Sequence, residues 1–324
     1  MYADIHSAAS ATIPHSPASP ANRSASGFWP ELLSDLSCLG DAWVETESPA
    51  LTLAHRAGLA GLRVQHDIAH LQGKDFALRL LLEGCDALSP MLPPCGAVAS
   101  PVESLFIEDA QRRPLLTLHL APQEDPSRFL LRTLLRTYGI GTRRLRPAPH
   151  RPLSLRGPQA AAGHAAAILE QRCAGLDDGI ELMDQAELSG LLALQPRRLR
   201  DHGSAIGVDP DLVPCALEAL ADHAVPIRIV TGNDACVRRV DGAPFAARRG
   251  RGWQYLRGDD LTLRLDTTLL DSAWVFQPGD DATAPRELRL YDVDGRAIMV
   301  LRSLPSLSGA EHAVWTTLMN ALLH

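Results

Sequence analysis

Apolar and polar residues alternate in two nearly identical stretches of this chain. The first, "LQGKDFALRL", covers Leu71–Leu80, and the second, "LRGDDLTLRL", covers Leu256–Leu265, 185 positions later. In the second half of each stretch apolar residues recur at every second position, and a period of two predicts a strand with one buried face. The turn residues "GKD" and "GDD" precede the two strands. The chain therefore contains the same turn and strand twice.

The similarity between the two regions extends beyond these strands. Upstream, Thr46–Leu51 matches Thr231–Cys236 at the same offset of 185, and downstream Ser104–Leu118 matches Glu287–Leu301 at an offset of 183. A nearly constant offset over several blocks indicates an internal duplication. We therefore predict two copies of one domain that differ slightly in loop length.

Each copy is expected to contribute several antiparallel strands. The segment "YDVDGRAIMVL" predicts a hairpin whose tight turn contains Asp294 and Gly295. The first copy has "EDAQRRPL" at this place, without glycine, which predicts a longer loop. Ser308 and Glu311 form a capping-box pattern at the start of the last helix. The predicted helices are Trp29–Leu39, Pro126–Tyr138, Gln159–Ala174, Gly179–Leu194, Leu212–His223 and Ser308–Leu323.

The chain of 324 residues is long enough for two medium-sized domains. We predict a flexible tail over residues 1–27, a first repeat over 28–140, a linker with inter-repeat helices over 141–207, and a second repeat over 208–324. The linker contains a run of arginines between positions 143 and 156. Such a run could bind an acidic partner or a phosphate backbone, or could simply be solvated.

Composition is typical of a soluble globular protein. Apolar residues make up 46% and charged residues 21% of the chain, and the net charge is −7. This acidic balance does not favour nucleic acid as a partner, so any basic patch must be local. The six cysteines form no CxxC pair, which favours a reduced, cytoplasmic compartment. Because no apolar stretch approaches the roughly 20 residues of a membrane helix, we expect no membrane insertion.

Three segments of the second copy carry a resemblance to a known family. "VPIRIVTGNDACVRRVDGAP" (Val225–Pro244), "LRGDDLTLRLDTTLLDSAWVFQPG" (Leu256–Gly279) and "RELRLYDVDGRAIMVL" (Arg286–Leu301) resemble the second repeat of the haem-utilisation HemS/ChuS family, which also includes ChuX-like proteins. The first copy is similar to the N-terminal half of that family in "LGDAWVETESPALTLAHRAG", "LQGKDFALRLLLEG" and "ESLFIEDAQRRPLLTLHL". The resemblance covers about residues 29–320. It implies an α+β fold of two pseudo-symmetric repeats, each a large antiparallel β-sheet with flanking helices.

The resemblance also implies a haem site, but several of its residues differ here. The family histidine lies in the helix before the second repeat, and the matching segment Leu182–Leu194 has Ala186 in its place. A distal arginine of the family falls near Val102 or Glu103, and a lysine falls at Gln277. The usual axial histidine is therefore absent, and this chain is expected to be a divergent member of the family.

Other residues could hold haem in its place. His164 lies in an alanine-rich predicted helix and His202 lies at a predicted helix end, so each could be either an axial ligand or a surface histidine. Arg197 and Arg198 follow the helix that would carry the ligand, which makes them candidate haem contacts.

Further side chains could be iron or metal ligands, but a structural role is favoured for each of them. Tyr255 and Tyr291 could ligate iron as phenolates or pack within strands, and Met183 could ligate or lie in a helix core. The pair His66 and His70 has a spacing that suits metal on a helix, but its context is loop and strand.

Two functions remain open at the level of sequence. The first is a cytoplasmic haem-utilisation protein that binds or delivers imported haem b for iron acquisition, together with a haem-uptake or haem-degrading protein. Residual haem degradation of the haem oxygenase kind stays open, because ring opening needs a defined axial ligand. The alternative is a family member that has lost haem binding and serves as an interaction or regulatory protein.

Overall fold

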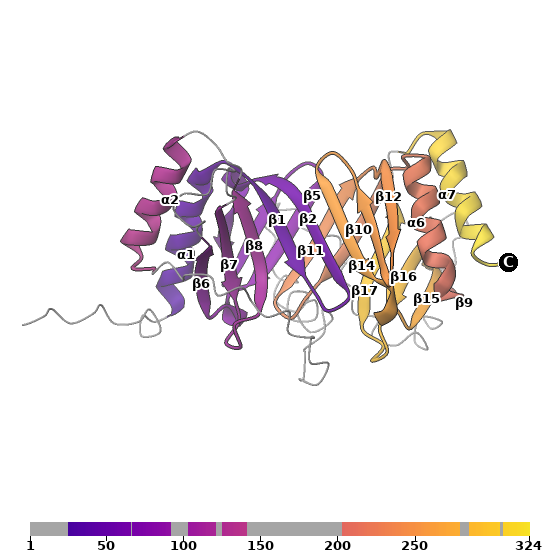
Figure 1. The fold of residues 1–324 in the computed structure, drawn as a ribbon, viewed down its shortest axis with the longest axis horizontal. Coiled ribbons are helices and arrows are strands. Elements are labelled where there is room, and N and C mark those ends of the chain that lie inside the picture. The colour runs from indigo at the N-terminus through magenta and orange to yellow at the C-terminus, as the bar shows by residue number, and fades with distance from the viewer. Residues whose placement is uncertain are drawn as a thin grey trace, which may run out of the picture.

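Two large sheets and two helix pairs make up the part of the chain that can be described (Figure 1). Each sheet extends along the long axis of the molecule, the two sheets overlap in this view, and one helix pair lies at each end. The computed structural model describes residues 25–65, 67–91, 103–120, 125–140, 203–278, 285–304 and 307–324.

The first sheet has eight strands in the order β12-β13-β14-β2-β1-β8-β7-β6, and all neighbours are antiparallel. From edge to edge its strands are β12 (Ala246–Gly250), β13 (Trp253–Arg257), β14 (Leu261–Asp266), β2 (Leu51–Gly58), β1 (Asp41–Glu47), β8 (Pro114–Leu120), β7 (Glu103–Glu108) and β6 (Ala87–Met91).

The second sheet has nine strands in the order β3-β4-β5-β11-β10-β17-β16-β15-β9, again antiparallel throughout. Its strands are β3 (Arg63–Gln65), β4 (Ile68–Gln72), β5 (Phe76–Leu81), β11 (Cys236–Gly242), β10 (Ile227–Gly232), β17 (Ala297–Ser303), β16 (Glu287–Tyr291), β15 (Ser272–Pro278) and β9 (Gly203–Val208).

The two sequence copies exchange strands. Strand β5 of the first copy pairs with β11 of the second and carries β3 and β4 into that sheet. In the same way β14 of the second copy pairs with β2 of the first and carries β12 and β13 with it. The twin stretches that end in β5 and β14 therefore occupy equivalent places in the two sheets. The α+β fold of two pseudo-symmetric antiparallel sheets with flanking helices is confirmed. The residue boundaries of the repeats stay a prediction, because each sheet draws strands from both.

The helices flank the sheets as the sequence pattern predicts. One pair is α1 (Ala25–Leu36) with α2 (Asp125–Thr137), and the other is α6 (Val213–Asp222) with α7 (Gly309–Ala321). At the start of α7, Ser308 accepts a hydrogen bond from the Glu311 amide and the Glu311 carboxylate accepts one from the Ser308 amide, so the capping box is confirmed. None of the helices described is both long and apolar enough to cross a lipid bilayer. The helices predicted over 159–174 and 179–194 lie outside the described residues.

The two equivalent hairpin turns have the same length, contrary to prediction. In β16–β17 the Asp292 amide donates to the Arg296 carbonyl, and Gly295 takes a φ of 73°. In β7–β8 the Asp109 amide donates to the Arg113 carbonyl in the same way, and Arg112 takes a φ of 64°. The predicted longer loop is wrong, because a non-glycine residue adopts the left-handed conformation here at a modest steric cost.

The inner faces of the two sheets pack against each other. Arg238 of β11 is buried between them and donates hydrogen bonds to the carbonyls of Val44 and Leu53, at 2.8 and 2.9 Å. Burial lowers its pKa to about 10. Nearby, burial and the Arg238 charge lower the pKa of His55 to about 4. Since Arg238 binds backbone atoms of the opposite sheet, it fixes which face of the nine-stranded sheet points inward and which points outward.

Candidate functional site

A row of charged side chains crosses the outer face of the nine-stranded sheet. Residues paired across antiparallel strands lie on the same face. The register places Phe276 beside Glu287, Glu287 beside Arg302, Arg302 beside Arg228, and Arg228 beside Asp241. The row thus runs from β15 to β11.

A second set of side chains lies next to this row. Arg289 lies two residues from Glu287 on β16 and is paired with Trp274 of β15, so both belong to the outer face. Tyr291 follows two residues later on the same strand and face. We call these residues the arginine cluster; its members are Arg228, Asp241, Trp274, Phe276, Glu287, Arg289, Tyr291 and Arg302.

Ion pairs within the arginine cluster are short and largely buried. Arg289 Nε donates to Glu287 Oε2 at 2.8 Å, and Arg302 Nε lies 2.6 Å from Glu287 Oε1. The exposed fractions of the three side chains are only 5% for Arg289, 3% for Glu287 and 15% for Arg302. Arg228 makes a bidentate pair with Asp241, with both hydrogen bonds at 2.8 Å. One carboxylate therefore serves two buried guanidiniums, and the named residues carry three cations against two anions.

Aromatic side chains adjoin these charges. The Arg289 guanidinium carbon lies 4.0 Å from the centre of the Phe276 ring, close enough for a cation–π contact. Tyr291 is completely buried, and its hydroxyl interacts with the Arg289 side chain. Burial raises the pKa of Tyr291, and the charge and hydrogen bond of Arg289 oppose that rise. The phenol is therefore part of the same buried group as Arg289 and Glu287.

Chemically, the arginine cluster suits a flat anionic ligand. Guanidiniums bind carboxylates in a planar, bidentate manner, and aromatic rings pack against the flat faces of conjugated ligands. Among the described residues no three His, Cys, Asp or Glu side chains come together as a metal site.

The residues predicted for haem contact lie elsewhere in the sequence. His164, His202, Arg197 and Arg198 lie outside the described residues, as do Ala186 and the arginine run 143–156. The haem contacts proposed for them stay predictions.

The structure does describe other residues that the sequence offered as candidate ligands. His70 faces Arg79 across β4 and β5 on the outer face, where both are buried. Tyr255 lies on the other sheet, whereas Tyr291 belongs to the arginine cluster. Arg79 and Arg264 occupy equivalent sheet-face positions in the two sheets.

The arginine cluster itself was not predicted as a site. Its charged residues alternate with apolar ones in "ELRLY" and share that pattern with many solvated strands. Only the pairing register, which places Glu287 between two arginines from different strands, distinguishes them.

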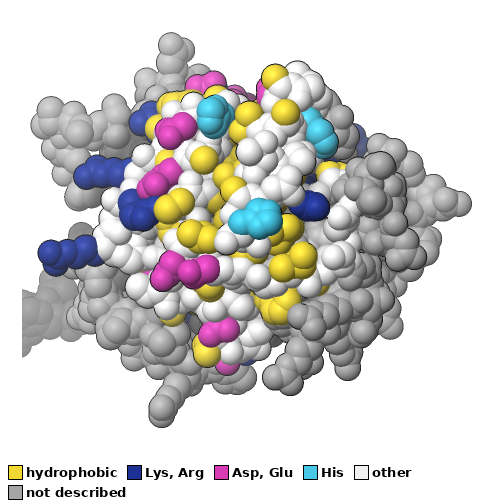
Figure 2. Space-filling view, turned by 90° about the vertical axis from the view of Figure 1, so that its right-hand side faces the viewer, with side chains coloured by type: hydrophobic (Ala, Val, Ile, Leu, Met, Phe, Trp, Pro, Cys, Tyr) yellow, Lys and Arg dark blue, Asp and Glu magenta, His cyan; other side chains and the backbone are white. Residues whose placement is uncertain are grey.

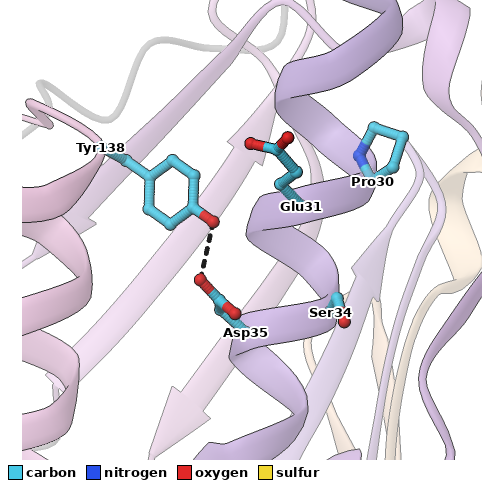
Figure 3. Close-up of a pocket in the computed structure, with 5 residues that line it drawn as sticks. All are labelled: Pro30, Glu31, Ser34, Asp35 and Tyr138. Carbon is cyan, nitrogen blue, oxygen red and sulfur yellow. Dashed lines mark hydrogen bonds between the residues drawn. The ribbon is translucent and has the colours of Figure 1, made fainter.

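A separate hollow of about 480 Å³ lies between α1 and the end of α2 (Figure 3). The Tyr138 hydroxyl points at Asp35 and donates a hydrogen bond of 2.7 Å to its carboxylate, while Glu31 lies one turn away. Burial and the Asp35 carboxylate raise the pKa of Tyr138 to about 12. Because two acidic residues line this hollow, it disfavours the anionic ligand that the arginine cluster suits.

A model of a known protein family matches the part of the chain that contains the arginine cluster. Residues 193–322 match the family model of the haemin-degrading HemS.ChuX domain. The match covers most of the second repeat, which is similar to a HemS/ChuX domain. The resemblance to the haem-utilisation family seen in the sequence is thereby confirmed. No protein of curated function matches the sequence.

Two solved structures share the fold over most of the chain. Holo-PhuS, a heme-binding protein from Pseudomonas aeruginosa, has a TM-score of 0.65 at 22% identity, covering 91% of this chain and 84% of PhuS. ChuS, an E. coli heme oxygenase, has a TM-score of 0.62 at 19% identity, covering 91% of this chain and 86% of ChuS. The first repeat, which the family model does not reach, therefore shares this fold as well.

Proposed function

We propose that this protein binds haem on the outer face of its HemS/ChuX domain and serves in haem utilisation. The observation that carries the proposal is the arginine cluster, a buried group of arginines and aromatic rings that lies wholly within the matched residues 193–322. The relatives with the same fold include a heme-binding protein and a heme oxygenase.

Each part of the arginine cluster has a role in this proposal. Arg289, Arg302 and Arg228 would bind the two propionates, because charge-assisted contacts to carboxylates are the strongest that arginine makes. Phe276 and Trp274 would pack against the macrocycle. The hydroxyl of Tyr291, which lies beside Arg289, fits a haem group, since it could donate to a propionate or contact the iron. When bound, haem supplies an iron centre whose reactivity depends on its axial ligand and on solvent access.

The finer assignments are proposals as well. His164 and His202 are the proposed axial ligands, and Arg197 and Arg198 are proposed additional contacts. We place the protein in the cytoplasm, where it would bind haem b and deliver it to a haem-uptake or haem-degrading partner. Delivery is preferred over ring opening because the histidine position of the family is Ala186.

A hemin titration followed in the Soret region tests the proposal. We expect a saturable shift with one hemin per chain. Tyr291→Phe is the informative variant, because it removes the hydroxyl beside Arg289 with little change in packing volume. It should lower the free energy of unfolding by about 1 kcal/mol, while weakening hemin binding or altering the spectrum.

The matched control is Arg56→Gln, a change in an exposed ion pair with Asp41 on the other sheet, where both side chains are about half exposed. It should bind hemin like the unaltered protein. The absence of a saturable Soret shift would overturn haem binding and favour the alternative, an interaction or regulatory protein. Replacing His164 and His202 singly with Ala then identifies the axial ligand if the low-spin spectrum is lost in one case.

A further inference from the structure

A basic hairpin forms one edge of the eight-stranded sheet. Strands β12 and β13 and the turn between them contain four arginines and no acidic residue over positions 246–258, although the whole chain carries a net charge of −7. The arginines are Arg248, Arg249, Arg251 and Arg257. The end of the molecule that carries this hairpin faces the viewer in Figure 2, where Lys and Arg side chains project from the left margin.

Arginines and aromatic rings interleave on the outer face of this hairpin. The register places Arg248 beside Tyr255 and Tyr255 beside Arg264 of β14, so the three form one row across three strands. Trp253 and Arg257 lie two positions to either side of Tyr255 on the same face. With strands about 4.8 Å apart and a rise of about 3.3 Å per residue, the backbone positions of these neighbours lie roughly 5–7 Å from that of Tyr255.

One arginine is already stacked on a ring. The Arg264 guanidinium carbon lies 3.5 Å from the centre of the Trp253 ring and 5.9 Å from that of Tyr255. Tyr255 is 39% exposed and Arg264 is exposed. A flat π surface therefore faces solvent in the middle of the basic row.

Most of the positive charge on the hairpin is not neutralised. Arg249 points to the inner face and pairs with Glu218 at 3.0 Å. Arg248, Arg251 and Arg257 are exposed and make no ion pair with any residue that the structure describes. On the inward side the patch ends at Glu47, whose pKa the Arg264 charge lowers against the larger effect of burial. Along β14 this face ends at Asp266, which is paired with Trp253, so the basic surface is confined to the arginines around Tyr255.

We propose that this hairpin binds single-stranded nucleic acid. Arg248, Arg251 and Arg257 would contact phosphates, and bases would stack on Tyr255 and beside the Arg264–Trp253 pair. Open sheet faces that combine arginines with exposed rings bind single strands in this way, because every base has a flat face to stack. Arginine alone would suit an acidic polypeptide equally, and the aromatic rings decide in favour of nucleic acid. The proposal does not depend on haem binding, and it revises the expectation drawn from net charge.

Fluorescence anisotropy with a labelled oligodeoxythymidylate of about 12 nucleotides tests the proposal on the full chain. We expect binding that weakens with salt, with a slope of log K against log salt of about −2 to −3 for three to four phosphate contacts. Arg248→Ala with Arg257→Ala should weaken binding by at least about tenfold. The matched control is Arg132→Ala with Arg136→Ala, which removes the same charge from exposed positions on α2, and it should change binding less than about twofold.

Replacing the exposed ring separates nucleic acid from other anions. Tyr255→Ala should weaken oligonucleotide binding, and Tyr255→Phe should keep it, because the ring and not the hydroxyl stacks. No binding at low salt would overturn the proposal. If the two double variants lose the same affinity for the oligonucleotide, overall charge alone explains binding, and the proposal is overturned as well. Polyglutamate that binds as tightly, with no effect of Tyr255→Ala, would assign the surface to an acidic polypeptide instead.

Discussion

Replacing Glu287 with Gln should destabilise the protein strongly. The Glu287 carboxylate lies between Arg289 and Arg302, with contacts of 2.6–2.8 Å, and its side chain is 3% exposed. Glutamine keeps the shape but removes the negative charge that both nearly buried guanidiniums contact. Removing one partner of a buried ion pair costs about 3–5 kcal/mol. At about 2 °C per kcal/mol for a chain of this size, the melting temperature should fall by roughly 6–10 °C.

Denaturant unfolding of the haem-free protein measures this loss. The control is Asp41→Asn, which breaks an arginine–carboxylate pair of similar length, 3.0 Å, whose side chains are 54% and 49% exposed. It should cost less than about 1 kcal/mol. If Glu287→Gln costs no more than Asp41→Asn, the arginine cluster is not the buried charge network described above. Added hemin should recover more stability in Glu287→Gln than in the unaltered protein, because the propionates replace the missing anion.

Three further results are expected. Because His55 has a pKa of about 4 in the folded protein, against about 6.5 when unfolded, the unfolded chain binds more protons between these values. Stability should therefore fall as the pH drops from 6.5 to 4, by about 3 kcal/mol more in the unaltered protein than in His55→Gln; equal pH profiles would contradict burial of a neutral imidazole. Ser308→Ala removes the α7 cap and should cost about 1 kcal/mol in denaturant unfolding, whereas Ser37→Ala, at an exposed hydroxyl bonded only to the Ser34 carbonyl, should cost little. The fragment 203–324 lacks the β5 and β2 partners of β11 and β14, so light scattering should find a dimer that exchanges β12–β14 between copies; a stable monomer would contradict the role of strand exchange.

The elements of this fold were largely readable from local pattern, and their pairing was not. Alternating leucines predicted β5 and β14, and the pattern at Ser308 predicted the start of α7, because both depend on neighbours in sequence. Strand exchange depends on which edges meet in space, and repeats of equal pattern fit either sheet. The turn at Arg112 was mispredicted because amides of the turn donate hydrogen bonds to Asp109 and allow a non-glycine residue at positive φ.

The candidate site was likewise predicted only where it depends on local sequence. The family resemblance identified the domain, and the missing histidine at Ala186 was visible from sequence. The arginine cluster was not, since Glu287, Arg302 and Arg228 come from three strands and meet only through register. A net charge of −7 likewise concealed the local basic hairpin.

The relative affinity for hemin and its dimethyl ester tests the central claim most directly. The ester keeps the macrocycle and iron but lacks the carboxylates that Arg289 and Arg302 would bind. We expect the protein to prefer hemin by at least about tenfold, as one charge-assisted contact of about 1.5 kcal/mol implies, and Arg289→Lys to reduce that preference. Equal affinity for the two ligands, or a preference unchanged in Arg289→Lys, would contradict a haem site at the arginine cluster.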